Sequence, residues 1–318
     1  MTRIAKYRHR LPQLEGGLFL TDGGLETTLV FHEGWELPCF EAFVLLESEH
    51  GRRTLRKYYD RYVSMAVGIG AGFVLESPTW RANTDWGRKL GYTAAALKRI
   101  NREAIELLLE LRDRLETPAA PIVVSGNIGP RGDGYDPGTL MHPEEARGYH
   151  RPQILAFREA GADLVSAFTM TNSNEAAGIA LAAEDAGMPC VISFTLETDG
   201  RLPSGESLAS AMKGVDDASG AGPAYYMINC AHPTHFEHVL DANSSWIARL
   251  RGLRANASRL SHAELDNAPK LDVGNPFELG GQYANLLRRL PHINVLGGCC
   301  GTDHRHVECI SAAYRPAA

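Results

Sequence analysis

The sequence predicts an α/β protein that folds as a single (β/α)8 TIM barrel with a closed parallel sheet. Short apolar runs alternate with helical patterns, eight such runs are present, and 318 residues suffice for this fold. Parallel strands require crossover connections, which the intervening helices provide. No linker, repeat or low-complexity tract divides the chain, so one domain is expected over residues 1–318, with 1–16 as an N-terminal arm.

The strand candidates are short runs rich in β-branched and apolar residues. They lie at 18–21, 72–76, 122–125, 164–168, 191–196, 225–229, 246–250 and 293–296. The clearest helix is expected over 93–115, where leucines and other apolar residues recur every three or four positions and share one face. The other helices are expected at 53–68, 143–160, 173–186, 207–215, 233–240, 277–290 and 303–313.

A doubly wound open sheet has the same alternation of strands and helices. An open sheet that binds a nucleotide usually carries a glycine-rich turn after its first strand. The nearest match, GIGAGF at 68–73, precedes a strand and lacks the third glycine of that fingerprint. We therefore interpret it as a helix end and a turn, and the eight units favour the barrel.

Composition excludes several classes of protein. The net charge is −6, from 32 basic and 38 acidic residues, whereas nucleic-acid binders are basic. No segment reaches the ~20 apolar residues of a membrane span, and the basic N-terminus lacks the apolar region of a secretory signal. Six cysteines are too few for a disulfide scaffold, so a cytoplasmic protein is expected.

Three cysteines follow two of the predicted strands. Cys230 ends the sixth strand, and Cys299 and Cys300 end the eighth. Alternate strands of a barrel contribute to common interior layers, so these thiols are expected to converge at the rim that carries the active sites of this fold. Adjacent cysteines on one ion require non-β geometry, and the glycines of GGCCG provide backbone freedom for it.

Three thiolates with one open position are typical of a catalytic Zn²⁺ site. Such a site can bind and ionise a substrate thiol, whose sulfur then attacks an activated alkyl group. The alternative is that the three cysteines pack as small hydrophobic residues, or that Cys299 and Cys300 form an oxidisable vicinal pair. The remaining cysteines, Cys39, Cys190 and Cys309, are expected in the core.

Two other functions remain open. His232, His235 and His238 recur every three residues after Cys230 and form a competing ligand set, which would suit a zinc hydrolase or lyase. A thiol cluster can also store metal or sense oxidation in a non-catalytic barrel. The absence of an HExxH motif favours the thiolate set.

Several segments resemble the homocysteine S-methyltransferase family. The matching segments are TDGGLETTL at 21–29, SGNIGP at 125–130, ISFTLETDGRLPSGESL at 192–208, NCAHP at 229–233 and GGCCGT at 297–302. The resemblance implies a (β/α)8 barrel with zinc on Cys230, Cys299 and Cys300. It also implies methyl transfer from a sulfonium or quaternary ammonium donor to a thiol acceptor such as homocysteine, giving methionine.

The resemblance also implies substrate-binding positions. They are Asp22, Gly23, Gly24, Glu76, Asn127 and Asn229. Exposed glycine amides after the first strand can bind a carboxylate. Trp80, Trp86 and Phe168 are candidates to surround a cationic donor.

Two departures from the family pattern concern the substrate. The family usually has an acidic residue at the end of the fourth strand, suited to the acceptor's ammonium, where this chain has Phe168. A buried ammonium needs a counter-charge, which Glu76, Asp22 or Glu197 would have to supply unless the acceptor is not a standard amino acid. The segment after the seventh predicted strand carries arginines that suit an anionic group. They are Arg249, Arg251, Arg254 and Arg259.

Overall fold

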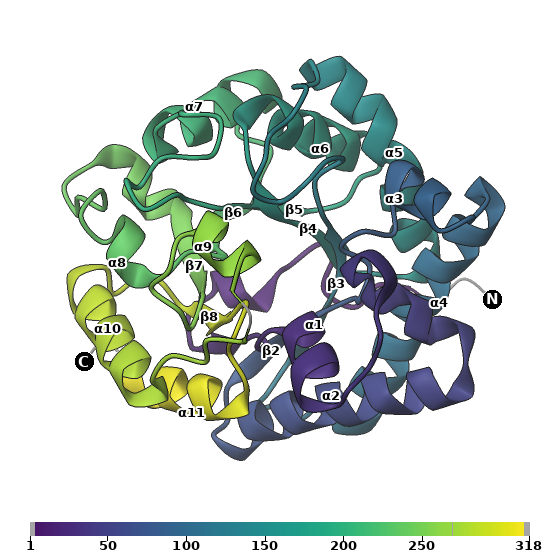
Figure 1. Cartoon of the computed structure of the whole chain (residues 1–318), viewed down its shortest axis with the longest axis horizontal. Helices are drawn as coiled ribbons and strands as arrows, with labels where there is room; N and C mark the ends of the chain where they lie inside the picture. The colour runs from purple at the N-terminus through teal and green to yellow at the C-terminus, as the bar shows by residue number, and fades with distance from the viewer. Residues whose placement is uncertain (1–3, 269, 315–318) are drawn as a thin grey trace.

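Eight parallel strands close into a barrel in the computed structural model, which describes residues 4–268 and 270–314 (Figure 1). Each strand pairs with the next in the chain, and Phe19 of the first strand pairs with Val295 of the last. The predicted (β/α)8 fold class is confirmed. The strands are β1 (Phe19–Leu20), β2 (Gly72–Glu76), β3 (Ile122–Ile128), β4 (Leu164–Met170), β5 (Cys190–Phe194), β6 (Tyr225–Asn229), β7 (Leu250–Ala255) and β8 (Val295–Gly298).

Helices alternate with the strands, and the longer helices surround the barrel and bury their apolar faces on it (Figure 1). They are α1 (Leu25–Thr27), α2 (Glu49–Gly68), α3 (Thr84–Lys89), α4 (Ala94–Leu115), α5 (Pro143–Ala160), α6 (Ser173–Asp185), α7 (Leu208–Ser219), α8 (Pro233–Phe236), α9 (His262–Asp266), α10 (Pro276–Arg289) and α11 (His304–Ala313). The helix predicted over 93–115 is α4, which begins after the Thr93 cap and buries Ile100 and Leu108. The helix predicted at 233–240 is shorter than expected, and α3 and α9 were not predicted.

The predicted seventh strand was misplaced. Residues 245–249 form a 3-10 helix, and β7 follows it as LRGLRA. The apolar residues of 246–250 suggested a strand. The true strand, β7, needs few apolar side chains because a side chain of the neighbouring strand β6 fills the barrel interior beside it. A Cβ on Gly252 would lie 2.4 Å from Cε of Met227 in β6. The inward position that follows, Arg254, has polar partners in the barrel.

The inward-facing residues change from apolar to polar along most strands, with Phe168 of β4 as an apolar exception near the carboxyl end. Alternate residues of a strand face the same side, so each strand contributes a column of side chains to the interior. Examples are Val123, Ser125 and Asn127 in β3, Leu164 and Ser166 in β4, Val191 and Ser193 in β5, and Met227 and Asn229 in β6. The barrel is therefore apolar at its amino end and polar at its carboxyl end.

The N-terminal segment packs against the apolar end of the barrel. Leu11 belongs to the interior apolar cluster, and the amide of Tyr7 donates a 2.9 Å hydrogen bond to Asp163. Asp163 also pairs with Arg112 at 2.6 Å. The first three residues of the predicted arm lie outside the described residues.

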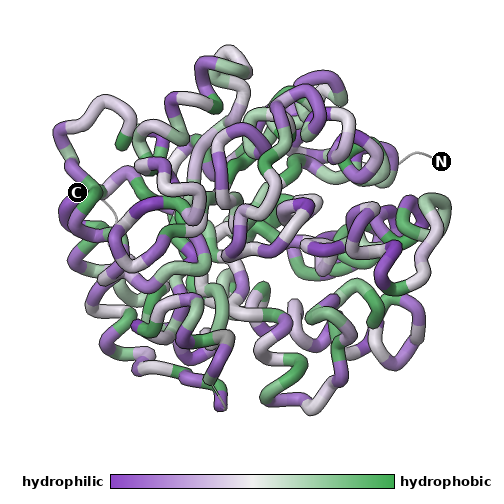
Figure 2. Tube along the Cα trace, turned by 45° about the horizontal axis from the view of Figure 1, so that its top comes forward, coloured by the Kyte–Doolittle hydropathy of each residue, from purple (hydrophilic) through white to green (hydrophobic). Residues whose placement is uncertain are grey.

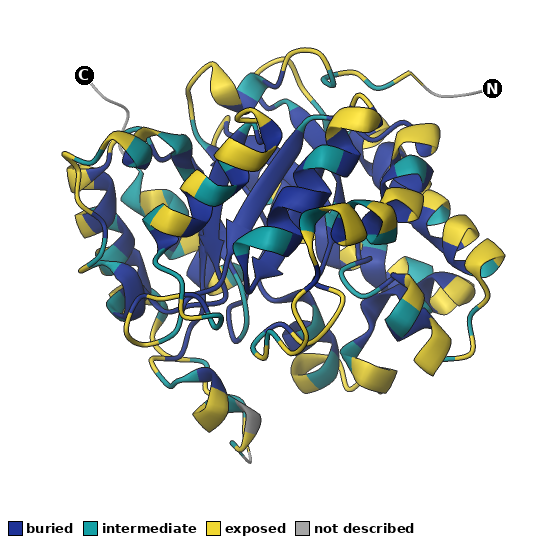
Figure 3. Ribbon diagram, turned by 90° about the horizontal axis from the view of Figure 1, so that it is seen from above, coloured by how far each residue is buried: buried dark blue, intermediate teal, exposed yellow. Residues whose placement is uncertain are grey.

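In Figure 3 the segment that carries α9 projects from the opposite side of the barrel to the N-terminus.

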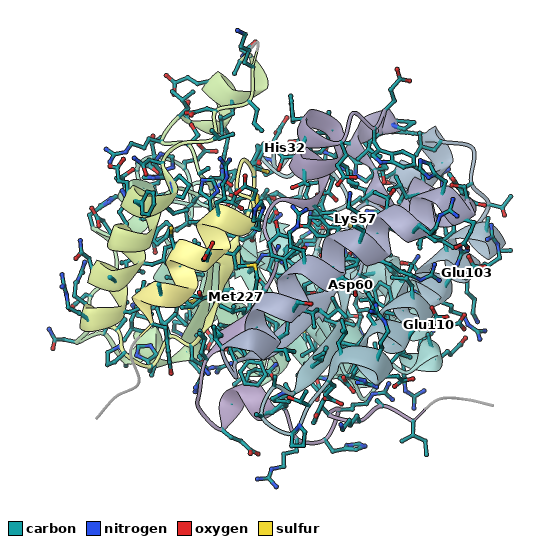
Figure 4. All side chains as sticks on the ribbon, turned by 90° about the horizontal axis from the view of Figure 1, so that it is seen from below. His32, Lys57, Asp60, Glu103, Glu110 and Met227 are labelled. Carbon is teal, nitrogen blue, oxygen red and sulfur yellow. A yellow bond between two sulfur atoms is a disulfide. The ribbon has the colours of Figure 1, made fainter. Side chains whose placement is uncertain are left out.

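The outer helices are amphipathic, and hydrophilic and hydrophobic stretches alternate along them (Figure 2). Ion pairs join α2 to α4 across their exposed faces, near the labelled Asp60, Glu103 and Glu110 (Figure 4). These pairs are Arg52–Glu103, Arg56–Glu110 and Arg114–Asp60. Exposed pairs of this kind contribute at most about 1 kcal/mol each. In the part of the chain that the structure describes, no helix has the length and apolarity to cross a bilayer.

Candidate active site

A cavity of about 400 Å³ opens at the polar end of the barrel. This volume lies within the ~300–1,000 Å³ typical of small-molecule sites. The cavity is lined by the three predicted zinc ligands and by all six substrate-binding positions that the family resemblance implies. They are Asp22, Gly23, Gly24, Glu76, Asn127, Asn229, Cys230, Cys299 and Cys300. Barrel closure brings these residues together from the ends of five strands, β1, β2, β3, β6 and β8.

The three cysteine sulfurs meet in the wall of this cavity. All three lie within 4.8 Å of one another, the one such cluster of metal-ligand side chains among the described residues. The sulfurs of Cys230 and Cys300 are 3.8 Å apart. Cys230 and Cys299 are joined as a disulfide, with 5.4 Å between their Cα atoms. The oxidised pair is therefore not the vicinal one that the sequence suggested.

The backbone leaves β geometry at Cys230, just after β6. Its φ of 54° lies in the left-handed region, which non-glycine residues adopt at a cost. On the other strand, β8 ends at Gly298, and the positive φ of 76° falls on Gly301. Gly297 and Gly298 were predicted to give the cysteine segment backbone freedom. Instead they allow close packing, because a Cβ on Gly297 would clash with Thr21 and one on Gly298 with Thr302.

The loop after β1 packs closely on the cysteine segment. A Cβ on Gly24 would lie 2.7 Å from the carbonyl oxygen of Cys299, so only glycine fits there. The amide of Gly24 donates to the carbonyl of Thr302 at 3.0 Å. That amide is therefore not free to bind a substrate carboxylate, contrary to the interpretation from the sequence.

Asp22 is occupied by protein partners. Nη2 of Arg254 donates to its Oδ1 at 2.5 Å, and the hydroxyl of Tyr58 donates to its Oδ2 at 3.1 Å. Arg254 also donates to the carbonyl of Gly298 and lies 4.9 Å from the ring centre of Phe168. Arg254 therefore joins the ends of β7, β1 and β8. Because it also balances the charge of Asp22, that carboxylate is not available to pair with a substrate ammonium.

Two other carboxylates of the cavity lack such a partner. Glu76 is 5% exposed, and its Oε2 accepts no hydrogen bond from the described residues. Burial raises the pKa of Glu76 to about 7, although Arg254 opposes this shift. Burial also raises the pKa of Glu26 to about 7. The buried Oδ1 of Asn127 likewise accepts no hydrogen bond from the described residues.

Asn229 joins the ends of β4 and β5 to β6 by hydrogen bonds. Its Oδ1 accepts from the amide of Thr169 at 2.9 Å and from the hydroxyl of Ser193 at 2.7 Å, and its Nδ2 donates to Oγ1 of Thr169 at 2.9 Å. Thr169 has a φ of 61°, so these bonds hold a strained residue at the end of β4. Nδ2 of Asn229 also lies 3.9 Å from the sulfur of Cys299.

Comparison with known proteins places this site in a family. A sequence model described as homocysteine S-methyltransferase matches residues 19–314. The chain belongs to the homocysteine S-methyltransferase family. The predicted enzyme class, a homocysteine S-methyltransferase, is thereby confirmed.

Individual relatives are distant. The chain is 28% identical to homocysteine S-methyltransferase 3 of Zea mays, over 93% of this chain and 89% of that protein. It is 24% identical to selenocysteine Se-methyltransferase of Brassica oleracea var. italica, over 93% and 88%. The metallated form of the homocysteine methyltransferase MmuM from Escherichia coli aligns with a TM-score of 0.69 at 20% identity, over 95% and 98%. The structural alignment supports the barrel fold.

Of the three aromatic residues that were predicted to surround a cationic donor, two line the cavity and one does not. Trp80 and Phe168 line the cavity, and Nε1 of Trp80 donates to the carbonyl of Phe168 at 3.2 Å. Trp86 does not line it, because its ring packs against Arg81 and Lys89. Phe40 and Tyr135 line the cavity and were not predicted.

The alternative histidine ligands of this methyltransferase are engaged elsewhere. His232 bonds to Thr234, His235 to the carbonyl of Arg259, and His238 to the carbonyl of Asp199. None belongs to the cluster that the described residues form around Cys230. The prediction that all other cysteines lie in the core is wrong for Cys39, which is exposed, and holds for Cys190, which is buried.

Three of the four arginines that were predicted to suit an anionic group lie outside the cavity. Arg249 pairs with Asp216, Arg251 bonds Asn294 and Arg259 pairs with Glu278, so only Arg254 of the four lines the cavity. The sequence analysis missed Phe40 and Tyr135 in the cavity wall, and His262, which bonds the carbonyl of Cys230. Tyr135 lies in an irregular segment and His262 begins the short helix α9, and in neither place does hydrophobic periodicity indicate which side chains turn inward.

Proposed function

We propose that this protein transfers a methyl group from a sulfonium or quaternary ammonium donor to a thiol of an amino acid such as homocysteine. The product would be a thioether such as methionine, which places the reaction in methionine biosynthesis. The observation that carries the proposal is the meeting of three cysteine sulfurs, from β6 and β8, in the wall of a substrate-sized cavity.

The cysteines suit zinc. Tetrahedral Zn²⁺ with Zn–S bonds of ~2.3 Å requires sulfur–sulfur distances of about 3.8 Å. The Cys230 and Cys300 sulfurs are 3.8 Å apart, and Cys299 lies in the same cluster. We propose that the reduced thiolates of Cys230, Cys299 and Cys300 hold Zn²⁺. When bound, zinc supplies Lewis acidity that lowers the pKa of a thiol.

The acceptor's ammonium is proposed to lie at Glu76. Of the three carboxylates that could replace an acid at position 168, Asp22 pairs with Arg254, and Glu197 lies 3.1 Å from Nδ1 of His262. Glu76 retains an oxygen with no partner among the described residues. An ammonium group only donates hydrogen bonds, so it complements Glu76 and the similarly unpartnered oxygen of Asn127.

The donor is proposed to be a cation that the aromatic wall and the acidic groups of the cavity stabilise. Trp80, Phe40 and Tyr135 line the cavity, and so does Glu26, whose ionised form a bound cation would favour. The acceptor thiol releases its proton to solvent, and the resulting thiolate sulfur uses a lone pair to form a bond to the methyl carbon. The bond from that carbon to the donor's sulfur or nitrogen breaks, and its electrons neutralise the cation. The cavity contributes by aligning the two reactants.

The test is methyl transfer by reduced, zinc-loaded protein. The enzyme is incubated with homocysteine and a labelled sulfonium or quaternary ammonium donor such as S-methylmethionine or betaine, and the labelled thioether is measured. Bound zinc of one per chain and labelled methionine are expected. Cys230→Ser, Cys299→Ser and Cys300→Ser are each expected to abolish transfer and bound zinc.

The matched control is Cys39→Ser, because Cys39 is an exposed cysteine outside the cavity. It is expected to retain zinc and activity. Zinc retention without transfer over a panel of donors and thiols would contradict the proposal. So would loss of zinc from His235→Ala with full zinc in the three cysteine variants.

A further inference from the structure

The carbonyl oxygen of Cys230 receives three side-chain hydrogen bonds. Nε2 of His262 donates at 2.7 Å, Nδ2 of Asn256 at 3.1 Å and Oγ1 of Thr195 at 3.3 Å. The amide of Cys230 donates to the carbonyl of Arg254 at 3.1 Å. Because Cys230 has a φ of 54°, this peptide needs external partners to keep its orientation. The shortest of the side-chain bonds comes from His262.

His262 is itself held rigidly. It is 4% exposed, and Oε1 of Glu197 lies 3.1 Å from its Nδ1. Its position at the start of α9 is set by Ser261, whose side chain caps the helix and bonds reciprocally with Glu264. Because both ring nitrogens have partners and the helix that carries the residue is capped, the imidazole of His262 is held in one orientation. His262 therefore fixes the Cys230 carbonyl from outside the barrel wall.

The same imidazole also contacts the third cysteine indirectly. The ring of Tyr135 stacks on His262, with 3.9 Å between ring centres and 20° between planes. The hydroxyl of Tyr135 lies 3.7 Å from the sulfur of Cys300. His262 thus connects the end of β6 to Cys300 after β8 through one ring contact. Nothing in these contacts places His262 itself among the ligands, since Nε2 is committed to the Cys230 carbonyl.

We propose that His262 is a positioning residue, which orients Cys230 directly and Cys300 through Tyr135 so that their sulfurs share one metal ion. This inference rests on the proposed function, because it assumes that the three cysteines bind zinc. The α9 segment, which the sequence did not indicate as part of the site, would then control metal affinity. Groups outside the ligand shell that orient ligands typically change metal affinity by about 10–100-fold.

The experiment compares zinc affinity in reduced His262→Ala and His235→Ala, by competition with a chromophoric chelator. His235 is the matched control because it is 5% exposed and its Nε2 bonds a carbonyl at 2.8 Å, but that carbonyl belongs to Arg259. We expect the His262 variant to weaken zinc binding by about 10–100-fold and the His235 variant to change it by less than about threefold. The cobalt-substituted proteins provide a second readout, since the thiolate-to-cobalt absorption band reports ligand geometry without turnover.

His262→Gln separates positioning from general destabilisation. Its side-chain amide can donate to the Cys230 carbonyl, so it is expected to recover part of the zinc affinity lost in His262→Ala, at equal or lower thermal stability. Equal zinc affinities and cobalt spectra in wild type and His262→Ala would overturn the inference. Loss of affinity that merely follows the fall in melting temperature, to the same extent in both alanine variants, would also overturn it. A reduced wild-type protein that binds no zinc would instead contradict the proposed function.

Discussion

The guanidinium of Arg254 donates to the carboxylate of Asp22 at 2.5 Å, and both side chains are more than 90% buried. This pair joins β7 to the loop after β1, and the same guanidinium reaches the carbonyl of Gly298 at the end of β8. Three strand ends are therefore held together directly beside the cysteine cluster. The pair also removes Asp22 from the groups available to a substrate.

Breaking this pair is expected to destabilise the protein strongly. Arg254→Gln leaves a buried carboxylate uncompensated, which should lower the free energy of unfolding by about 3–5 kcal/mol. The double variant with Asp22→Asn should recover part of that loss, since no charge remains buried. Denaturant unfolding measures both. Arg114→Gln, which breaks the exposed pair with Asp60, is the control and should cost less than about 1 kcal/mol. If the losses in free energy of unfolding of Arg254→Gln and Asp22→Asn simply add in the double variant, the two side chains are not coupled and the prediction is wrong.

Glu76 should make the protein less stable as pH rises from about 4.5 to about 7. Its pKa is raised by burial to about 7 in the folded state, so the folded state binds the proton more tightly than the unfolded state in this window. Glu76→Gln should remove this contribution, worth about 1.4 kcal/mol for each pKa unit. The measurement is the free energy of unfolding near pH 5 and pH 8. The variant should gain stability relative to wild type at the higher pH, and an unchanged pH dependence would contradict the prediction.

Gly24 should tolerate no side chain. In Gly24→Ala the added Cβ would lie 2.2 Å from Oγ1 of Thr27 and 2.7 Å from the carbonyl oxygen of Cys299, so the cysteine segment must shift. Methyl transfer and zinc affinity should both fall by at least about tenfold, given the sensitivity of such sites to ~1 Å displacements. Gly148→Ala in α5 is the control, because its Cβ meets nothing within 4 Å. That substitution should raise stability by up to about 1 kcal/mol.

Asn229 should be required for the backbone geometry at the end of β4. Asn229→Ala leaves the amide of Thr169 without its acceptor and removes the contact with the Cys299 sulfur. We expect a loss of about 1–3 kcal/mol in stability and a lower kcat with the refolded, zinc-loaded variant. Asn243→Ala, at an exposed turn, serves as the comparison and should change neither quantity. A normal kcat in Asn229→Ala would mean that the strained Thr169 does not shape the site.

The sequence predicted the barrel well where periodicity was clean and poorly where it was not. The bounds of β2 and β6 match the prediction residue for residue. The seventh strand was misplaced because Gly252 lies against Met227, which supplies the apolar volume that β7 lacks. No pattern within LRGLRA indicates this, since the compensating side chain belongs to another strand.

The sequence by itself determined the strand–helix alternation, the polar carboxyl end of the strands and the identity of the three cysteines, because these depend on local periodicity and residue chemistry. Only the tertiary structure decided which carboxylates are neutralised by partners and which are not. Arg254 lies 232 positions from Asp22, and His262 approaches Cys230 and Tyr135 from the start of the short helix α9. Contacts of this kind depend on barrel closure and loop paths, which local sequence does not encode.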